Sequence, residues 1–146
     1  MTNNIQIKPL CSKPDTQFMS LMDRFLDSIG EAPMTSTQRS SLTQAVTGGQ
    51  IHFFLAWDGP VLVGMCSVSP CFSTFGCATS GVFDDFYILP DYRHRGIARL
   101  LADHAQDWCR QQGYASLTVG CSDGDIGMYQ NLGFNIRLGT MLAADL

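Results

Sequence analysis

The amino-acid sequence predicts an α/β fold, in which one mixed, mostly antiparallel sheet carries flanking helices. Three observations support this fold class. Runs rich in β-branched and aromatic residues alternate with segments of helical periodicity. Two of these runs flank Asp58-Gly59, a dipeptide typical of a β-hairpin turn. The chain has 146 residues, which is enough for one domain, spanning 1–146, with its own core.

The first half of the chain is predicted to form a strand, two helices and a hairpin. Residues 5–8 alternate apolar and polar side chains, as a short strand does. In residues 15–29, apolar side chains recur every three or four positions, which predicts an amphipathic helix. A second helix is expected over 35–46, with Ser36 or Thr37 as its cap. The runs 51–57 and 61–68 should then pair as antiparallel strands.

The second half is predicted to alternate strands and helices. Residues 69–81 are expected to form a loop or an irregular extension of the preceding strand. The remaining elements follow in order: a buried strand over 81–89, a helix over 96–112, a strand over 115–121, a short helix over 123–132 and a final pair of strands. Glycines at 113 and 133 mark the ends of the two helices.

Composition excludes several classes of function. The chain has 9 Lys and Arg against 13 Asp and Glu, a formal net charge of −4, which argues against a nucleic-acid partner. The N-terminus has no signal-peptide pattern and no membrane-spanning run, so a soluble, cytoplasmic protein is expected. The six cysteines lack C-x-x-C spacing and are expected to be reduced core thiols. With three histidines and no H-E-x-x-H, no metal site is expected.

The most informative segment is 84–98, which passes from a predicted strand through a turn into a predicted helix. The first N–H groups of a helix are unpaired, and the helix dipole favours negative charge there. Gly96 lets an anion approach the backbone, and Ala98 leaves the next turn open. The segment therefore predicts a pyrophosphate site, although an ordinary strand-to-helix connection is the alternative.

The hexapeptide from Arg93 to Ala98 has the pattern R-x-x-G-x-A, and Tyr129 and Leu132-Gly133-Phe134 follow about thirty residues later. Together these features resemble the GCN5-related N-acetyltransferase (GNAT) superfamily. The resemblance is firm over 81–134 and covers the rest of the chain in outline. It implies acetyl-CoA as acyl donor and a sheet whose central strands splay apart.

The resemblance also implies which residues hold the donor. Backbone amides of the strand end would bind the pantetheine arm and the thioester carbonyl, and those of the turn would bind the pyrophosphate. The strand-end residues are Tyr87, Ile88 and Leu89, and the turn residues are Arg93, His94, Arg95, Gly96, Ile97, Ala98 and Arg99. The side chains of Arg93 and Arg95 would add positive charge. Ser122 stands where the family often has an Asn that contacts pantetheine; Ser122 is also placed to form a capping box with Asp125.

Two residues are candidates for catalysis. The resemblance implies that the Tyr129 hydroxyl hydrogen-bonds the departing sulfur of coenzyme A. The alternative is that Tyr129 is a core aromatic of the last helix. Asp84 is similar in position to the catalytic Glu of spermidine/spermine N-acetyltransferases and would take a proton from an amine, directly or through water. Strand alternation would turn Asp84 and Asp85 to opposite faces, so at most one points into the cleft. Alternatively, both bind arginines or solvent.

The sequence thus predicts transfer of acetyl from acetyl-CoA to a primary amine of a small molecule or peptide, by direct attack in a ternary complex. The acidic residues mildly favour a cationic acceptor, such as a polyamine or an aminoglycoside-like amine. The alternative is a non-catalytic acyl-CoA-binding sensor or regulatory domain. Only residues 135–146 follow Phe134, so the acceptor pocket is either open or completed by a second subunit, and a homodimer is possible.

Overall fold

A computed structural model describes residues 4–146 and contains a five-stranded sheet in the order β1-β2-β3-β4-β5. The strands are β1 (Ile5–Pro9), β2 (His52–Asp58), β3 (Val61–Ser73), β4 (Ala78–Ile88) and β5 (Leu117–Val119). The first four pair in antiparallel fashion, and β4 pairs with β5 in parallel. The predicted mixed, mostly antiparallel sheet is therefore confirmed.

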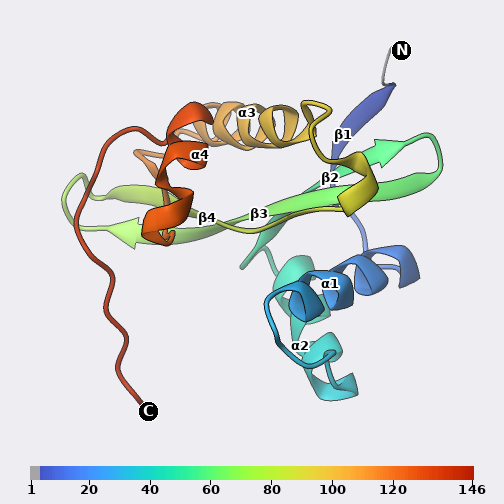
Figure 1. Cartoon of the computed structure of the whole chain (residues 1–146). Helices are drawn as coiled ribbons and strands as arrows, with labels where there is room; N and C mark the ends of the chain where they lie inside the picture. Colours follow the sequence, from blue (N-terminus) through green and yellow to red (C-terminus); the bar gives the residue numbers. More distant parts are fainter. Residues whose placement is uncertain (1–3) are drawn as a thin grey trace.

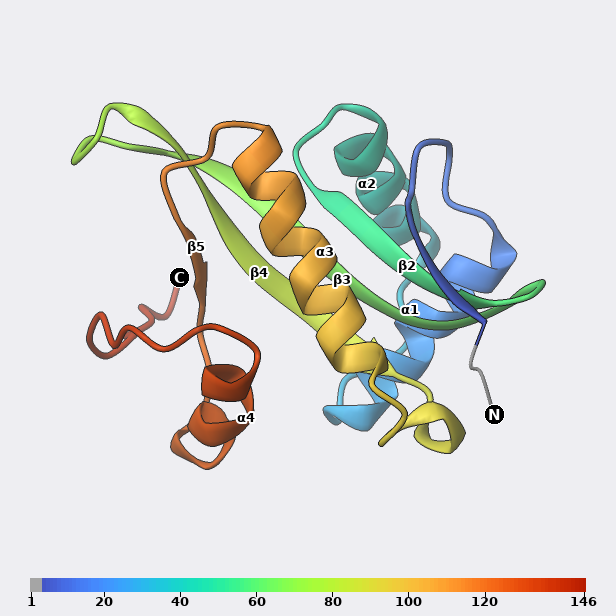
Figure 2. The same ribbon diagram turned by 90° about the horizontal axis from the view of Figure 1, so that it is seen from above.

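Helices cover both faces of the sheet (Figure 1). The helix α1 (Thr16–Ser28) and the helix α2 (Ser36–Thr47) lie on one face. The helix α3 (Ile97–Gln111) crosses the other face, and α4 (Ile126–Asn131) lies beside it near β5 (Figures 1 and 2). Two short 3-10 turns, Pro90–Tyr92 and Asp123–Asp125, precede α3 and α4.

The core is divided by the sheet into two apolar clusters. Side chains of β2, β3 and β4 that face α3 pack with Ile97, Leu101 and Ala105 of that helix. Side chains on the opposite face pack with Phe18 and Leu21 of α1. Alternation along the strands sends neighbouring residues to different faces. The sheet therefore separates the α1–α2 side from the α3–α4 side.

Most predicted elements are present with small changes at their ends. The cap of α2 is Thr35, which forms a capping box with Gln38, rather than Ser36 or Thr37 as expected. Residues 69–73 extend β3, which was one of the two alternatives for that segment. The final pair of strands was wrong: after α4, residues 132–146 form neither helix nor strand.

The cysteine prediction was only partly right. All six thiols are free, as expected, but only Cys66 and Cys109 are buried. The other four are exposed in loops and segment ends. Within residues 4–146, no helix is long and apolar enough to cross a membrane, and no three His, Cys, Asp or Glu side chains gather to hold a metal ion.

The central strands splay apart, as the resemblance implied. β4 pairs with β5 only from Gly81 to Phe83, whereas its pairing with β3 continues to Ile88. A Cβ at Gly81 would lie 2.8 Å from Val68 Cγ1 of β3 and 3.0 Å from Leu117 Cδ1 of β5, so a side chain at this position would have to displace its neighbours on both strands. Beyond Phe83 the β5-side edge of β4 is left without a strand partner among the described residues, and the candidate site begins there.

Candidate functional site

The start of α3 presents free backbone amides. Gly96 is the N-cap with φ +82°, and no side chain of residues 4–146 caps it. The first helical bond runs from the Leu100 N–H to the Gly96 oxygen at 3.2 Å, so the N–H groups of Ile97, Ala98 and Arg99 have no acceptor within the helix. A Cβ at Gly96 would meet nothing within 4 Å, so space beside the turn is open. His94, at φ +60°, also adopts the left-handed conformation that exposes such a turn.

Two arginines support this turn. Arg93 Nε donates to the Ile88 oxygen at 3.0 Å, and its guanidinium lies 5.6 Å from the centre of the Tyr87 ring. The Arg95 guanidinium lies 5.1 Å from the centre of the Tyr92 ring. Both side chains therefore bring positive charge to the segment that carries the free amides. The groups expected to hold a pyrophosphate are together, and they suit an anion.

The end of β4 corrects one sequence expectation. The Leu89 N–H donates to the Val63 oxygen at 2.9 Å, so this amide is not free to bind a ligand. In an antiparallel strand the N–H groups of successive residues point to opposite edges. The Leu89 and Tyr87 amides therefore face β3, and the Ile88 N–H faces the splayed edge. Of the three predicted strand-end amides, Ile88 is the available donor.

Tyr129 of α4 belongs to an aromatic cluster beside the splayed edge. Its ring lies 6.5 Å from that of Phe83, 6.2 Å from that of Phe86 and 6.0 Å from that of Phe134, measured between centres. Burial, followed by the charges of Asp125, Cys121 and Asp84, raises the pKa of Tyr129 to about 12. The hydroxyl therefore keeps its proton near neutral pH and is able to donate a hydrogen bond.

Two other predicted residues have partners of their own. The Arg99 side chain donates to the Asn131 oxygen, so it joins α3 to α4, and only its amide remains for a ligand. The Ser122 hydroxyl lies 3.0 Å from Asp125 Oδ2, a bond between side chains. The expected capping box is therefore absent at Ser122, since no side chain in the described chain caps that turn.

Asp85, beside the predicted Asp84, is the unusual carboxylate of β4. The register of β3 and β4 shifts between Met65 and Ser67, and Asp85 takes φ +50°, a strained value for a residue with a side chain. This bulge breaks the alternation assumed from the sequence. Phe83 and Phe86 consequently share the α3 face, and Tyr87 packs on the α1 face.

The environments of the two carboxylates differ. Asp84 is exposed, and its Oδ1 accepts the Asp85 N–H at 2.9 Å. Asp85 is half-buried and accepts the Ser67 hydroxyl at 2.6 Å on Oδ2. Burial raises the pKa of Asp85, the Ser67 hydrogen bond lowers it in part, and the Asp84 charge raises it further. A strained, partly desolvated carboxylate in a strand is typical of a functional site.

Asp85 lines a cavity of about 410 Å³ on the α1–α2 face of the sheet. The cavity lies between both helices, their connection and β2, and its walls are mostly apolar, including Leu26, Leu42 and Phe53. Sequence reasoning did not identify this cavity. Its one visible signal was the pair of adjacent aspartates in a strand, which packing alone does not explain.

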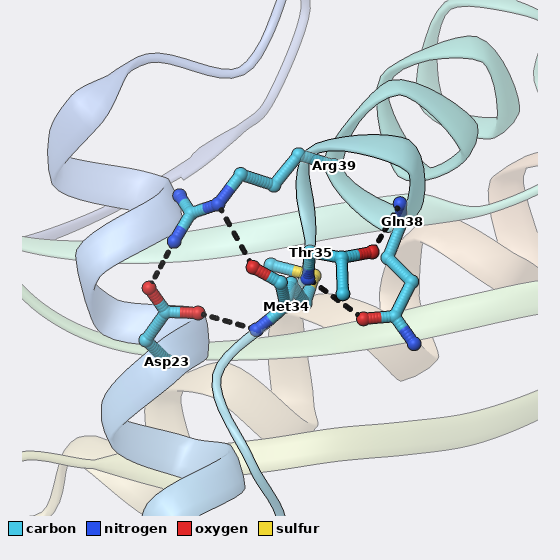
Figure 3. Close-up of polar contacts among 5 residues, drawn as sticks. All are labelled: Asp23, Met34, Thr35, Gln38 and Arg39. Atoms are coloured by element: carbon cyan, nitrogen blue, oxygen red, sulfur yellow. Dashed lines mark hydrogen bonds and ion pairs between the residues drawn. The ribbon is translucent and has the colours of Figure 1, made fainter.

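The wall formed by the α1–α2 connection is held by a polar cluster (Figure 3). Asp23 of α1 accepts the Met34 N–H at 3.2 Å and forms an ion pair with Arg39 of α2. Arg39 Nε also donates to the Met34 oxygen at 3.4 Å. The Gln38 side chain in turn accepts the Thr35 N–H at 2.8 Å. These bonds fix residues 34–35 and with them one side of the cavity.

Comparison with known proteins supports the family that the sequence resembles. The model of the acetyltransferase (GNAT) family matches residues 18–134, which is most of the chain. The chain belongs to the GNAT acetyltransferase family. A search of curated proteins found no match.

Solved structures of several acetyltransferases share the fold. An aminoglycoside acetyltransferase from an uncultured soil metagenomic sample, in complex with trehalose, has a TM-score of 0.87 and 13% identity, covering 99% of this chain and 97% of that one. For an acetyltransferase of Trypanosoma brucei the TM-score is 0.79 and the identity 18%, covering 98% and 100%. For a predicted acetyltransferase of Clostridium acetobutylicum with acetyl-CoA, the TM-score is 0.80 and the identity 14%, and the match covers 97% of this chain and 96% of that one. At these identities the likeness shows the fold.

Proposed function

We propose that the protein transfers an acetyl group from acetyl-CoA to a primary amine by direct attack within a ternary complex. One observation carries this proposal: the C-terminal half of β4 lies next to two groups of opposite character. Just after β4, free backbone amides and two arginines at the start of α3 suit a pyrophosphate. Within β4, the half-buried carboxylate of Asp85 lines a cavity on the α1–α2 face and suits an amine.

The donor would be held mainly by backbone groups. The amides of the turn 94–99 would bind the pyrophosphate, with Arg93 and Arg95 adding positive charge. The Ile88 N–H, turned to the splayed edge, would bind the thioester carbonyl and stabilise negative charge that develops on its oxygen. Acetyl-CoA supplies an acetyl thioester, whose C–S bond breaks as the C–N bond to the amine forms and whose sulfur takes up one proton.

The acceptor must lose protons, because an alkylammonium ion has a pKa of about 10.4 and has no lone pair to attack with. One proton leaves before attack and a second leaves as the C–N bond forms. Asp85, with its raised pKa, is the better placed of the two carboxylates to receive a proton, since it lines the cavity. Asp84 stays a candidate for passing that proton through water to the exterior, as it is exposed beside Asp85.

Tyr129 would assist the leaving sulfur. With a pKa of about 12, its hydroxyl stays protonated and can donate a hydrogen bond to a thiolate. Full proton transfer is unfavourable, because a thiol with a pKa near 8.5 is a stronger acid than this phenol. The sulfur would therefore leave as a thiolate hydrogen-bonded to Tyr129 and take up one of the two protons that the amine releases, through solvent.

Isothermal titration with acetyl-CoA tests the donor site, with Gly96→Glu and Gly96→Ala as a matched pair. Both substitutions place a side chain at φ +82° and share the same backbone strain. Only glutamate adds negative charge where the pyrophosphate would lie, so we expect Gly96→Glu to weaken binding by about 100-fold and Gly96→Ala to retain it. Absence of acetyl-CoA binding by the wild type would overturn the proposal.

A non-catalytic acyl-CoA-binding domain would pass that titration, so the second half of the test is turnover. Mass spectrometry should detect amines that gain one acetyl group together with free CoA. Binding without acetylation of any amine would favour the binding domain. The strained, half-buried Asp85 in its cavity supports the enzyme, because acetyl transfer needs a proton acceptor beside the amine.

The expected homodimer remains a proposal, and the C-terminal segment supports it. Residues 135–146 carry apolar side chains that are largely exposed, namely Ile136, Leu138, Met141 and Leu142. Covering such side chains with a second copy would remove them from water. Light scattering should give twice the chain mass for the wild type and a single chain mass for Leu138→Asp. A wild type with a single chain mass would contradict the proposed homodimer.

A further inference from the structure

The cavity beside Asp85 has one inner polar anchor and apolar walls. Side chains from three elements supply these walls, with Leu26 in α1, Leu42 in α2 and Phe53 in β2. Phe53 is buried and Leu26 and Leu42 are half-buried. The volume of about 410 Å³ lies within the range of about 300–1,000 Å³ usual for small-ligand sites.

The other polar side chains of the cavity, Glu31 and Gln38, are exposed to solvent. Gln38 already accepts the Thr35 N–H through its side-chain oxygen. Glu31 is exposed, so its charge is screened by water and ions. Asp85 is thus the group that meets a ligand charge away from bulk water. Ser67 keeps its carboxylate in place by a 2.6 Å hydrogen bond.

We infer that the acceptor is a small primary monoamine with an apolar body, its nitrogen at Asp85 and its body against Leu26, Leu42 and Phe53. This inference rests on the proposed acetyltransferase function and names its substrate class. A half-buried carboxylate favours one cationic nitrogen. The apolar walls favour a body that needs no hydrogen bonds, because hydroxyl or ammonium groups placed there would lose their water without gaining partners.

The inference departs from two expectations raised by the acidic composition. A polyamine would bring further ammonium groups against apolar walls. An aminoglycoside would bring many hydroxyl groups that the cavity cannot satisfy. Each case places added polar groups against apolar walls, where they lose water contacts that only the exposed Glu31 and Gln38 side chains could replace.

Initial rates with three amines test the substrate class: phenylethylamine, spermidine and glucosamine. We expect kcat/KM for phenylethylamine to exceed those for the other two by at least about tenfold, because its ring replaces water on the apolar walls. Equal or higher kcat/KM for spermidine or glucosamine would overturn the inference while leaving the acetyltransferase proposal intact. Failure of the wild type to bind acetyl-CoA in a separate titration would instead remove the proposed function itself, and the inference with it.

Three substitutions near the end of α1 localise the effect. Leu26→Gln puts a polar group into the cavity wall, and we expect it to raise the KM for phenylethylamine about tenfold. Ile29→Gln is the matched control, because Ile29 is 57% exposed and does not line the cavity. Leu26→Met keeps an apolar wall and should restore the wild-type KM, which separates loss of the contact from loss of the fold.

Direct binding gives a readout independent of turnover. Titration of phenylethylamine into the protein saturated with CoA should show binding that Leu26→Gln weakens by the same factor as the KM and that Ile29→Gln leaves unchanged. A Leu26→Gln protein that is folded by circular dichroism and binds phenylethylamine like the wild type would overturn the inference.

Discussion

The two candidate binding regions of this molecule are built from different parts of the chain. The donor side, at the start of α3, consists mostly of backbone N–H groups within one continuous segment, 88–99. The acceptor side is lined by side chains from α1, α2, β2 and β4, which are far apart in the sequence. Backbone groups bind phosphates whatever the neighbouring side chains are, whereas an amine is selected by side chains. Changes on the acceptor side should therefore affect catalysis and selectivity more than donor binding.

The largest effect is expected at Asp85. Asp85→Asn keeps an acceptor for the Ser67 hydroxyl but cannot take up a proton, so kcat should fall by about 100-fold or more. Acetyl-CoA affinity, measured by titration, should stay unchanged. Asp84→Asn is the neighbouring control: it removes an exposed carboxylate and should cost less than about tenfold in kcat. The reverse order of the two variants would assign proton removal to Asp84.

A smaller effect is expected at Tyr129. Tyr129→Phe keeps the ring among Phe83, Phe86 and Phe134 and removes only the hydroxyl. Loss of one hydrogen bond to the departing sulfur should lower kcat by about tenfold, with acetyl-CoA binding retained. Initial rates at saturating donor measure this. An unchanged kcat would make Tyr129 a packing residue.

Arg95 should show a modest effect that is confined to the donor. Arg95→Met keeps an apolar stem against Tyr92 and removes one exposed positive charge. The Kd for acetyl-CoA should rise by about threefold to fivefold at low salt, and the difference should shrink as salt is added. Titration at two ionic strengths tests this, and a difference that salt leaves unchanged would argue against an electrostatic role.

The smallest effect concerns stability. Because burial raises the pKa of Asp85 above its ordinary value of 3.8, the folded protein binds this proton more tightly than the unfolded chain. Stability is therefore lost as the pH rises from 3.8 through the folded pKa. Asp85→Asn removes this loss, so its Tm should exceed that of the wild type by about 2–4 °C near pH 7.5 and match it near pH 3.5. A variant less stable than the wild type at pH 7.5 would contradict the raised pKa.

The donor side is formed by one continuous segment and the acceptor side by distant elements, and this difference explains what could be predicted from the sequence. The strands, the helices and the donor turn follow local rules, such as hydrophobic periodicity, the Asp58-Gly59 turn and the glycine before α3. The side of β4 on which Asp85 lies depends on a bulge opposite Cys66 that no local pattern marks. The engaged Leu89 amide likewise depends on pairing with β3. Residues 135–146 alternate too weakly to specify strands, and they form none.

The central claim is that donor and acceptor are bound by separate regions that meet along β4. Initial rates measured over both substrates, for wild type, Arg95→Met and Leu26→Gln, test this claim directly. The account predicts that Arg95→Met raises only the KM for acetyl-CoA and that Leu26→Gln raises only the KM for phenylethylamine. If Leu26→Gln raised the KM for acetyl-CoA instead, or if Arg95→Met raised only the KM for phenylethylamine, the assignment of the two regions would be contradicted.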